Sequence, residues 1–407
     1  MQEGYLKNQE NQEPDSFEQF FKEKYFSRSL SKKIKLVARL FKEEKISLKE
    51  AGLILGVLPQ EAEAIFVQKG LTDRKKILVC GGAGFIGSNF IHYMLEKYPS
   101  IEIINYDKLT YAGNLENLRD MENYPRYKFI QDDITNGERI EQVMEEGIDA
   151  VVNFAAETHV GRSVHGRAGE FIYANVLGPY TLLEAVKKYK VPKFIQISTD
   201  EVFGTVDLDE NRHFTENSPF EPNVPYAAAK AGGDLLCRAY WQTYKVPVIV
   251  THCSNNYGPY QHPEKMIPYF IFRAMNGQSI PLHGDGKHVR DWIFALDHCE
   301  AIDLILQRGK PGEVYNISSN NERPNIEIAK LILDILGQPY SLIDFVPDRP
   351  GNDRRYSIDS SKIRRDLGWS PSNSFEDAMP KTIQWYQNNL DWVERIKERD
   401  QEFVNYI

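Results

Sequence analysis

The sequence predicts an α/β protein built on a doubly wound parallel sheet, with a helical N-terminal extension and a smaller C-terminal α/β domain. Three observations predict this class. From residue 75 onward, short apolar runs alternate with helical stretches, which is typical of βαβ units. A glycine cluster separates the first run from the first helix. Residues 1–74 lack this alternation. We therefore expect an extension over residues 1–74, a first α/β domain over 75–251, and a smaller domain over 252–407, some segments of which return to the first sheet.

Bulk composition excludes several classes of protein. The 407 residues, 42% of them hydrophobic, are enough for two or three domains. The net charge of −9 provides no basic field for nucleic acid or membrane surfaces. No apolar run reaches the roughly eighteen residues of a spanning helix, and the polar start does not fit a secretory signal. The cysteines are far apart, which argues against a disulfide framework or a metal site and favours the reducing cytoplasm; they are Cys80, Cys237, Cys253 and Cys299.

The N-terminal extension is expected to be helical over residues 17–70. Ser47 to Glu50 has the spacing of a capping box, Gly56 is suited to a turn, and Pro59 is suited to the first turn of a following helix. This pattern loosely resembles a helix-turn-helix, and residues 22–49 carry ten Lys or Arg against three Glu. DNA binding is one interpretation. We favour a helical appendage that packs on its own enzyme or on a partner subunit, because basic faces are commonly just solvated.

The core domain is predicted element by element from its apolar runs. Short runs rich in β-branched residues indicate buried strands, and longer amphipathic stretches between them indicate helices on both faces of the sheet. The expected strands span residues 76–80, 101–106, 127–131, 150–154, 194–197 and 248–251; the expected helices include residues 90–97, 171–190 and 227–244.

The first strand leads into a glycine-rich turn. Gly81, Gly84 and Gly87 recur at three-residue spacing between this strand and the helix. Glycines let the backbone approach a pyrophosphate, which binds at the N-terminus of the helix. Asp107 closes the second strand twenty residues later, where a carboxylate accepts hydrogen bonds from a ribose diol and repels a 2′-phosphate. The unit predicts NAD rather than NADP as cofactor; the alternative is a structural turn with a surface aspartate.

Tyr226 and Lys230 are four residues apart on an expected helix and so share one face. A nearby ammonium group lowers the pKa of a phenol, which makes tyrosine a usable base at neutral pH. The bare Tyr-x-x-x-Lys pattern is common by chance. It gains weight here because it follows a dinucleotide-binding unit.

The stretch Ser198 to Gly204, STDEVFG, follows the fifth expected strand. A turn needs one Asx or Gly residue, whereas this stretch places Thr199, Asp200 and Glu201 at the end of a hydrophobic strand, where burial of charge is costly. Two adjacent carboxyl groups can hold opposite protonation states, because one charge raises the pKa of its neighbour. An Asx-type turn with an exposed glutamate is the alternative.

Together these motifs resemble the extended short-chain dehydrogenase/reductase superfamily, which has a Rossmann-type fold. Within it, the STDEVFG stretch is similar to the signature of the nucleotide-sugar 4,6-dehydratases. The resemblance covers about residues 75–390 and does not include residues 1–74. Further similar segments are residues 154–159, 253–260, 263–265, 284–292, 348–351 and 353–356.

The resemblance implies a hydro-lyase reaction on a nucleotide sugar, with dTDP-glucose as the expected substrate. Tyr226, assisted by Lys230, is expected to act as base at the C4 hydroxyl while NAD accepts the hydride. Thr199 is expected to bind the C4 oxygen, Glu201 to remove the C5 proton, and Asp200 to protonate the C6 hydroxyl. A related nucleotide-sugar epimerase or decarboxylase is an alternative, and a DNA-reading sensor built on a retired enzyme is another.

The resemblance also implies binding residues. Those expected around NAD are Gly81, Gly84, Phe85, Ile86, Gly87, Asp107, Lys108, Leu109, Thr110, Asp133, Ile134, Ala155, Ala156, Thr158, Tyr226, Lys230 and Asn256; those expected around the substrate are Thr158, Thr199, Asn255, Lys265, Met266, Pro281, His283, Arg290, Asn325, Asp348 and Arg349.

Several positions depart from the family pattern. Gly161 stands where an aspartate is typical, His283 where a tyrosine commonly flanks the base, and Asn352 where a histidine is usual. Gly161 is expected to leave room in the sugar pocket, so UDP-, GDP- or CDP-sugars and 2-acetamido sugars stay open as substrates. The resemblance further implies a homodimer through a four-helix bundle formed by residues 166–189 and 225–244 of each subunit.

Overall fold

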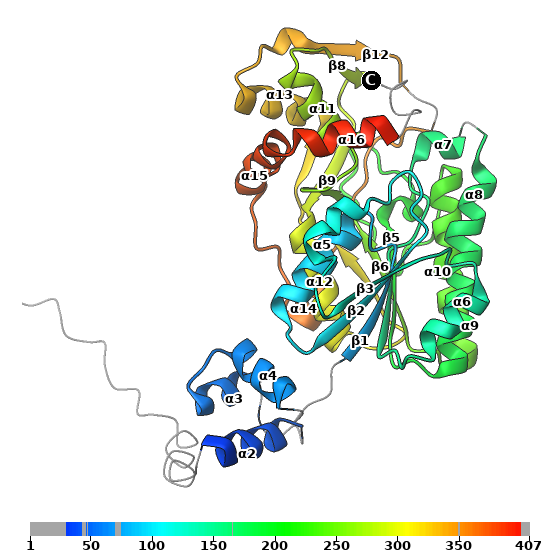
Figure 1. Ribbon diagram of the computed structural model, residues 1–407. Coiled ribbons are helices and arrows are strands. Elements are labelled where there is room, and N and C mark those ends of the chain that lie inside the picture. Colours follow the sequence, from blue (N-terminus) through cyan, green and yellow to red (C-terminus); the bar gives the residue numbers. More distant parts are fainter. Residues whose placement is uncertain are drawn as a thin grey trace, which may run out of the picture. The chain divides into compact units, whose positions relative to one another are not determined.

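The computed structural model describes residues 30–42, 46, 48–69, 75–164, 166–348 and 351–399 (Figure 1). Two expectations, the Ser47 cap and the substrate role of Arg349, lie outside these residues.

Three helices form the described part of the N-terminal extension: α2 (Leu30–Lys42), α3 (Leu48–Leu55) and α4 (Pro59–Gln68). The turn between α3 and α4 uses Gly56 at a φ of 75°, a left-handed conformation that glycine adopts without steric cost. Pro59 begins α4, as predicted. The three helices share an apolar core of their own, built mainly from Ile34, Val37, Ala38, Ile46, Ala51, Ala62 and Phe66.

The central sheet has seven strands in the order β10-β6-β5-β4-β1-β2-β3. The pairs β2–β3, β1–β4, β4–β5, β5–β6 and β6–β10 run parallel. The chain winds outward from β1 in two directions, so a crevice opens between β1 and β4 at the carboxyl ends of the strands, where open α/β sheets bind ligands. The strands are β1 (Lys75–Cys80), β2 (Ile101–Asp107), β3 (Tyr127–Gln131), β4 (Ala150–Asn153), β5 (Phe194–Thr199), β6 (Val248–Cys253) and β10 (Val314–Ile317).

All six predicted strands are present; β1 and β2 are one residue longer than predicted, and β5 and β6 are two residues longer. β5 continues through Thr199 and β6 through Cys253, because each pairs with its neighbour to that point. The predicted strand over residues 150–154 ends one residue earlier. The seventh strand, β10, was not predicted as a strand; it adds to the edge of the sheet beside β6 and is one of the segments expected to return from the C-terminal part.

Helices cover both faces of the sheet, with α6, α9 and α10 on one side and α5, α12 and α14 on the other (Figure 1). The stretch predicted as one helix over residues 171–190 is divided by a π-helical turn, Tyr173–Leu177. Pro179 lacks the N–H that an α-helix requires there, which accounts for the wider turn. The helices of this part are α5 (Phe85–Lys97), α6 (Gly137–Met144), α7 (Val160–Val164), α8 (Ala168–Ile172), α9 (Gly178–Tyr189), α10 (Pro225–Tyr244), α12 (Ala295–Arg308) and α14 (Ser361–Leu367), with short 3₁₀ turns at Leu115–Met121 and Asp200–Phe203.

The C-terminal part has two small sheets with helices packed against them. One sheet has the order β11-β9-β7 and the other pairs β12 with β8. Among the residues that the structure describes, no helix has both the length and the apolar character needed to cross a membrane. The elements are β7 (Asn255–Tyr257), β8 (Ile280–His283), β9 (Val289–Phe294), β11 (Glu322–Pro324), β12 (Ile343–Val346), α11 (Met266–Met275), α13 (Asn325–Leu336), the 3₁₀ turn Tyr340–Leu342, α15 (Phe375–Asn388) and α16 (Leu390–Arg399).

Candidate active site

A cavity of about 800 Å³ lies at the carboxyl ends of the central strands. The glycine turn after β1, Asp107 at the end of β2, the Thr199–Glu201 segment after β5 and the Tyr226–Lys230 face of α10 all line it. Elements far apart in the sequence therefore meet at the crevice that the strand order creates.

At two positions of the glycine turn, a side chain would collide with backbone atoms. A Cβ atom on Gly81 would lie 2.5 Å from the backbone nitrogen of Ala155, and Gly81 has a φ of 74°. A Cβ atom on Gly87 would lie 2.4 Å from the carbonyl oxygen of Gly81. α5 begins at Phe85, and the first N–H groups of a helix have no partner within it. The turn thus presents backbone donors and a positive dipole end to the cavity.

Asp107 is held at the end of β2 by two backbone donors. Its Oδ2 accepts a hydrogen bond from Ala83 N at 2.9 Å, and its Oδ1 accepts one from Leu109 N at 2.8 Å. Burial raises the pKa of this carboxyl group, and the two hydrogen bonds oppose that effect. Each oxygen keeps a second lone pair, which is what a ribose diol requires.

Sixteen of the seventeen residues expected around NAD line the cavity. The exception, Leu109, acts through its backbone, which is left-handed at a φ of 57° and donates to Asp107. Two of these residues pair with each other: Lys108 Nζ and Asp133 Oδ2 form an ion pair at 2.7 Å. Burial raises the pKa of Asp133, but the hydrogen bond from Lys108 and further donors outweigh it and leave that pKa below its usual value.

The STDEVFG stretch is the end of a strand followed by a 3₁₀ turn, Asp200–Phe203. Thr199 is the last residue of β5, and its Oγ1 accepts a hydrogen bond from Glu201 N at 3.3 Å, which caps the turn. The tight turn places Asp200 and Glu201 on the cavity wall, with Asp200 only 3% exposed. An exposed Asx-type turn is therefore not what the structure shows.

The surroundings of Asp200 favour its protonated form. Burial raises the pKa of its carboxyl group well above the usual value, and the negative charges of Glu201 and Asp291 raise it further. Its Oδ1 faces the hydroxyl of Thr199 at 3.3 Å, whereas its buried Oδ2 has no hydrogen-bond partner among the described residues. A neutral acid beside a glutamate is the arrangement that proton donation and proton removal in one pocket require.

The pKa of Tyr226 corrects a sequence-based expectation. Burial, followed by the negative charge of Glu201, raises the pKa of the phenol well above its usual value, although a hydrogen bond from Thr199 lowers it. The ammonium group of Lys230 donates to the carbonyl of Ile197 at 2.6 Å. It therefore does not lower the pKa of the phenol below its usual value, and burial lowers the pKa of Lys230 itself.

Thr158, Thr199, Asn255 and Lys265 line the cavity, as expected for substrate ligands. The buried Oδ1 of Asn255 has no partner among the described residues. Six further residues expected around the substrate do not line this cavity; they are Met266, Pro281, His283, Arg290, Asn325 and Asp348.

Two of these outlying residues, Arg290 and His283, bind neighbouring groups of the C-terminal part. Arg290 donates to the carbonyls of Val289 and Asp353, both at 2.8 Å, and its guanidinium lies 4.2 Å from the ring centre of Tyr356. The hydroxyl of Tyr356 is 3.5 Å from Glu201 Oε2, so the side chain of Tyr356 lies between Arg290 and Glu201. His283 Nδ1 lies 3.0 Å from the carbonyl oxygen of Pro347.

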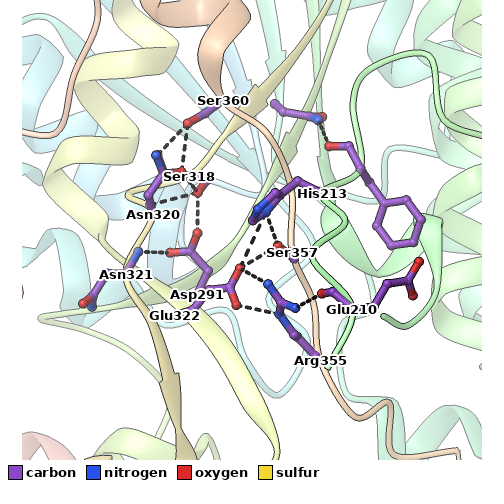
Figure 2. A network of polar contacts seen from close by, with 12 residues as sticks. Glu210, His213, Asp291, Ser318, Asn320, Asn321, Glu322, Arg355, Ser357 and Ser360 are labelled. Carbon is purple, nitrogen blue, oxygen red and sulfur yellow. Dashed lines mark hydrogen bonds and ion pairs between the residues drawn. The ribbon is translucent and has the colours of Figure 1, made fainter. Parts of the chain in front are cut away.

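A network of polar contacts joins β9 and β11 to neighbouring loops (Figure 2). Asp291, on β9, accepts hydrogen bonds from Ser318, Ser319 and the backbone of Asn321. Glu322 binds Arg355 Nε at 2.6 Å and Ser357 Oγ at 2.5 Å. Arg355 also donates to the carbonyl of Glu210 at 2.6 Å. The network thereby links β9 and β11 to the loop that follows the 3₁₀ turn of Asp200.

A charged cluster on the cavity wall was not predicted. The guanidinium of Arg162 lies 3.5 Å from the ring centre of Tyr111, and the hydroxyl of Tyr111 donates to Glu264 Oε1 at 3.0 Å. Arg162 also lies 3.9 Å from Glu264, which is 5% exposed. Glu264 lies in a segment that is similar to the family, but no role was predicted for it. The three residues are too far apart in the sequence for their spacing to reveal the cluster.

The same cluster corrects the expectation for Gly161. A Cβ atom on Gly161 would lie 2.8 Å from Cε1 of His159, so the imidazole already fills that space. His159 Nδ1 accepts a hydrogen bond from Arg162 N at 3.1 Å, and its Nε2 lies 3.6 Å from Glu264 Oε2. Gly161 therefore does not enlarge the cavity.

The seven-stranded Rossmann-type sheet, with a glycine turn facing a Tyr-x-x-x-Lys helix across one cavity, defines an extended short-chain dehydrogenase/reductase. Residues 78–382 match a protein-family model described as GDP-mannose 4,6-dehydratase. The chain belongs to this 4,6-dehydratase family. The matched region begins after α2–α4.

Individual proteins that resemble this chain include dTDP-glucose 4,6-dehydratases and a nucleotide-sugar epimerase. A dTDP-glucose 4,6-dehydratase of Xanthomonas campestris pv. campestris (strain B100) is 47% identical over 338 residues, covering 78% of this chain and 95% of the relative. A solved dTDP-glucose 4,6-dehydratase of Bacillus anthracis in complex with NAD is 47% identical, with a TM-score of 0.75 over 79% of this chain and 100% of that one. A solved UDP-glucose 4-epimerase of Thermotoga maritima is 29% identical, with a TM-score of 0.72 over 77% of this chain and 99% of that one.

Proposed function

We propose that this protein is an NAD-dependent dTDP-glucose 4,6-dehydratase, a hydro-lyase that forms the nucleotide-linked 4-keto-6-deoxyhexose. The observation that carries the proposal is the buried Asp200, whose pKa is raised, next to Glu201 in the cavity that also holds Tyr226. Epimerisation at C4 needs a base and a hydride acceptor but no acid for a leaving hydroxyl. Elimination of water needs the additional acid–base pair.

The residues present fit NAD. The glycine turn admits a pyrophosphate because two of its positions exclude even a Cβ atom, and Asp107 offers lone pairs to a ribose diol. A 2′-phosphate would meet this buried carboxylate, so NADP fits poorly. When bound, NAD⁺ would supply a positive charge and the acceptor for the C4 hydride, and its reduced form would return that hydride to C6.

The side chains divide the reaction between them. Tyr226 accepts the proton of the C4 hydroxyl, while Thr199, which bonds to the phenol, orients the C4 oxygen. Loss of hydride turns C4 into a ketone, which acidifies the C5 proton, and Glu201 removes it. Asp200 gives its proton to the C6 hydroxyl, which leaves as water when the C5–C6 double bond forms. Hydride at C6 and a proton at C5 then complete the 4-keto-6-deoxy product.

The preference for dTDP-glucose rests on the comparisons. The relatives and the structures at 45–47% identity are named dTDP-glucose 4,6-dehydratases, whereas the epimerase neighbours are 27–29% identical. The position of Gly161 no longer argues for a larger sugar, since His159 fills its space. UDP-, GDP- and CDP-hexoses are the alternative substrates, and the experiment below includes them.

A homodimer is part of the proposal. Apolar side chains are exposed along α8, the π-helical turn, α9 and α10, the helices expected to form a four-helix bundle with a second copy. Burial of such a row of side chains in a subunit interface would stabilise the pair. These residues are Ile172, Tyr173, Leu177, Tyr180 and Leu235. The four cysteines are free and buried, in keeping with the reducing cytoplasm that we propose as the location.

The test is to incubate the purified protein with a panel of dTDP-, UDP-, GDP- and CDP-hexoses, including N-acetyl forms, and to identify the products by mass. We expect loss of one water from dTDP-glucose and a product that absorbs in alkali, as 4-keto-6-deoxy sugars do. Loss of water from another nucleotide sugar alone would correct the substrate. Loss of water from none would overturn the proposed function.

A further inference from the structure

A buried polar network lies behind the catalytic face of α10 and has no part in the steps proposed above. Asp234 follows Lys230 by four residues, and its side chain is 2% exposed. Its Oδ2 accepts a hydrogen bond from Ser198 Oγ at 2.6 Å and lies 3.3 Å from His252 Nε2. Ser198 is on β5 and His252 is on β6, so one carboxylate joins α10 to two neighbouring strands.

The network continues to the edge strand and is closed to water. His252 Nδ1 lies 3.3 Å from Asn316 Oδ1 on β10. The rings of Phe203 and Phe220 pack edge-on against the imidazole, with centroid distances of 4.8 and 5.6 Å. Hydrogen bonds and ion pairs in such a dry environment are stronger than in water, and their loss is costly.

The contacts of Asp234 lie next to the proposed catalytic groups. Ser198 directly precedes Thr199, and Lys230 Nζ donates to the carbonyl of Ile197 at 2.6 Å. The thiol of Cys253 donates to the carbonyl of Ser198 at 3.3 Å. The end of β5 is therefore held from α10 on one side and from β6 on the other, one residue before the threonine that bonds to the Tyr226 phenol.

Asp234 also provides a negative charge that acts on the buried ammonium group of Lys230. Burial lowers the pKa of Lys230, and the negative charge of Asp234 opposes this effect. The other groups that face Lys230 are Cys237 on the same helix and Cys253 on β6. Burial raises the pKa of both thiols, that of Cys253 to about 12, so both are neutral near pH 7.

We infer that Asp234 is a positioning residue of this active site: its carboxylate fixes Tyr226 and Lys230 relative to Thr199 through Ser198 and His252, and its charge favours the ammonium form of Lys230. The inference rests on the proposed function, which assigns the catalytic roles to these residues. Asp234 itself does not line the cavity.

The test compares wild type with Asp234→Asn, which keeps the shape of the side chain and removes its charge. Two quantities are measured. The first is kcat and KM for dTDP-glucose. The second is the titration of Lys230, followed by trace acetylation with isotopically labelled acetic anhydride over a range of pH and by mass spectrometry of the Lys230 peptide. Lys230 lines the cavity, so the reagent has a route to it.

We expect kcat to fall by about tenfold or more with KM changed by less than about threefold, and the midpoint of Lys230 labelling to move to lower pH by about one unit, since an adjacent opposite charge shifts a pKa by one to three units. Asp303→Asn is the matched control, because Asp303 is a fully buried aspartate on α12 that bonds to Tyr93 and lies outside the cavity. It is expected to leave both quantities unchanged.

The inference is overturned if Lys230 titrates alike in wild type and Asp234→Asn, or if Asp303→Asn shifts it equally. If Asp234→Asn does not fold, Ser198→Ala removes the tether and keeps the charge. That variant should lower kcat without moving the Lys230 midpoint, and an unchanged kcat would overturn the positioning role. Failure of the proposed function would give a different result from failure of this inference. The wild-type protein would then release water from no substrate, while the titration of Lys230 could still be measured.

Discussion

Replacement of Asp200 by asparagine should separate the two halves of the proposed reaction. The variant keeps the volume of the side chain and an oxygen for the contact with Thr199, which is 3.3 Å in the wild type. The amide has no proton to transfer to the C6 hydroxyl. General acid catalysis is typically worth about 10²–10⁴-fold in rate, or roughly 3–5 kcal/mol of activation free energy. We expect kcat for water loss to fall by about this factor, with removal of the C5 proton by Glu201 retained.

The assay is solvent exchange in D₂O, followed by mass spectrometry of recovered substrate and product. With Asp200→Asn, recovered dTDP-glucose should gain one deuterium at C5 while little 4-keto-6-deoxy product forms. Product at the wild-type rate would show that Asp200 is not the acid. Loss of both exchange and product would show that the two carboxyl groups do not act in separate steps.

The same variant has an expected effect on stability. Burial raises the pKa of Asp200 in the folded protein. As pH rises above the ordinary carboxyl value of about 4, the unfolded chain releases a proton that the folded protein keeps. The free energy of unfolding of the wild type therefore falls until pH passes the folded pKa. Asparagine removes this loss, so the gain in Tm of Asp200→Asn over wild type should grow as pH rises above about 4. A gain that shrinks with pH would contradict the raised pKa.

Three further substitutions have defined outcomes. Glu201→Gln should retain bound NAD yet abolish both turnover and C5 exchange, and undiminished product would rule out its role as base. Gly87→Ala should purify with at least about tenfold less NAD, measured after acid release, because its Cβ would lie 2.4 Å from Gly81 O; Gly169→Ala, whose Cβ meets nothing within 4 Å, is the control, and equal NAD content would contradict the fit. Leu235→Glu should lower the mass in light scattering to that of a monomer, whereas Phe345→Glu, exposed at 57% on β12, should not; an unchanged mass for Leu235→Glu would argue against the four-helix bundle.

Most of the fold could be predicted from the sequence, because the patterns that indicate strands and turns are local. Each predicted strand is a short apolar run, and the glycine turn and Asp107 follow from the strand–turn–helix unit that contains them. β10 was missed because its four residues are a strand only by pairing with β6, some sixty residues earlier in the chain. The π-helical turn depends on Pro179 in the middle of an otherwise helical pattern, which the apolar periodicity does not reveal.

The sequence predicted which strand ends and turns line the cavity, but it did not predict the electrostatics of the cavity. Thr199, Asp200 and Glu201 are adjacent in sequence, so their joint placement needs only the end of one strand. The direction of the Tyr226 pKa shift depends on burial and on Glu201, which is contributed by another element. The Arg162–Tyr111–Glu264 cluster joins three separate segments, and the shape of the pocket at Gly161 depends on where His159 points.

Transfer of a label within one substrate molecule tests the central claim most directly. dTDP-glucose carrying deuterium at C4 is converted by the purified protein, and the product is examined by mass spectrometry and NMR. If one cavity oxidises C4 and later reduces C6, the deuterium appears in the C6 methyl group of the 4-keto-6-deoxy product. Deuterium that stays at C4, or that is lost to solvent, would contradict the account.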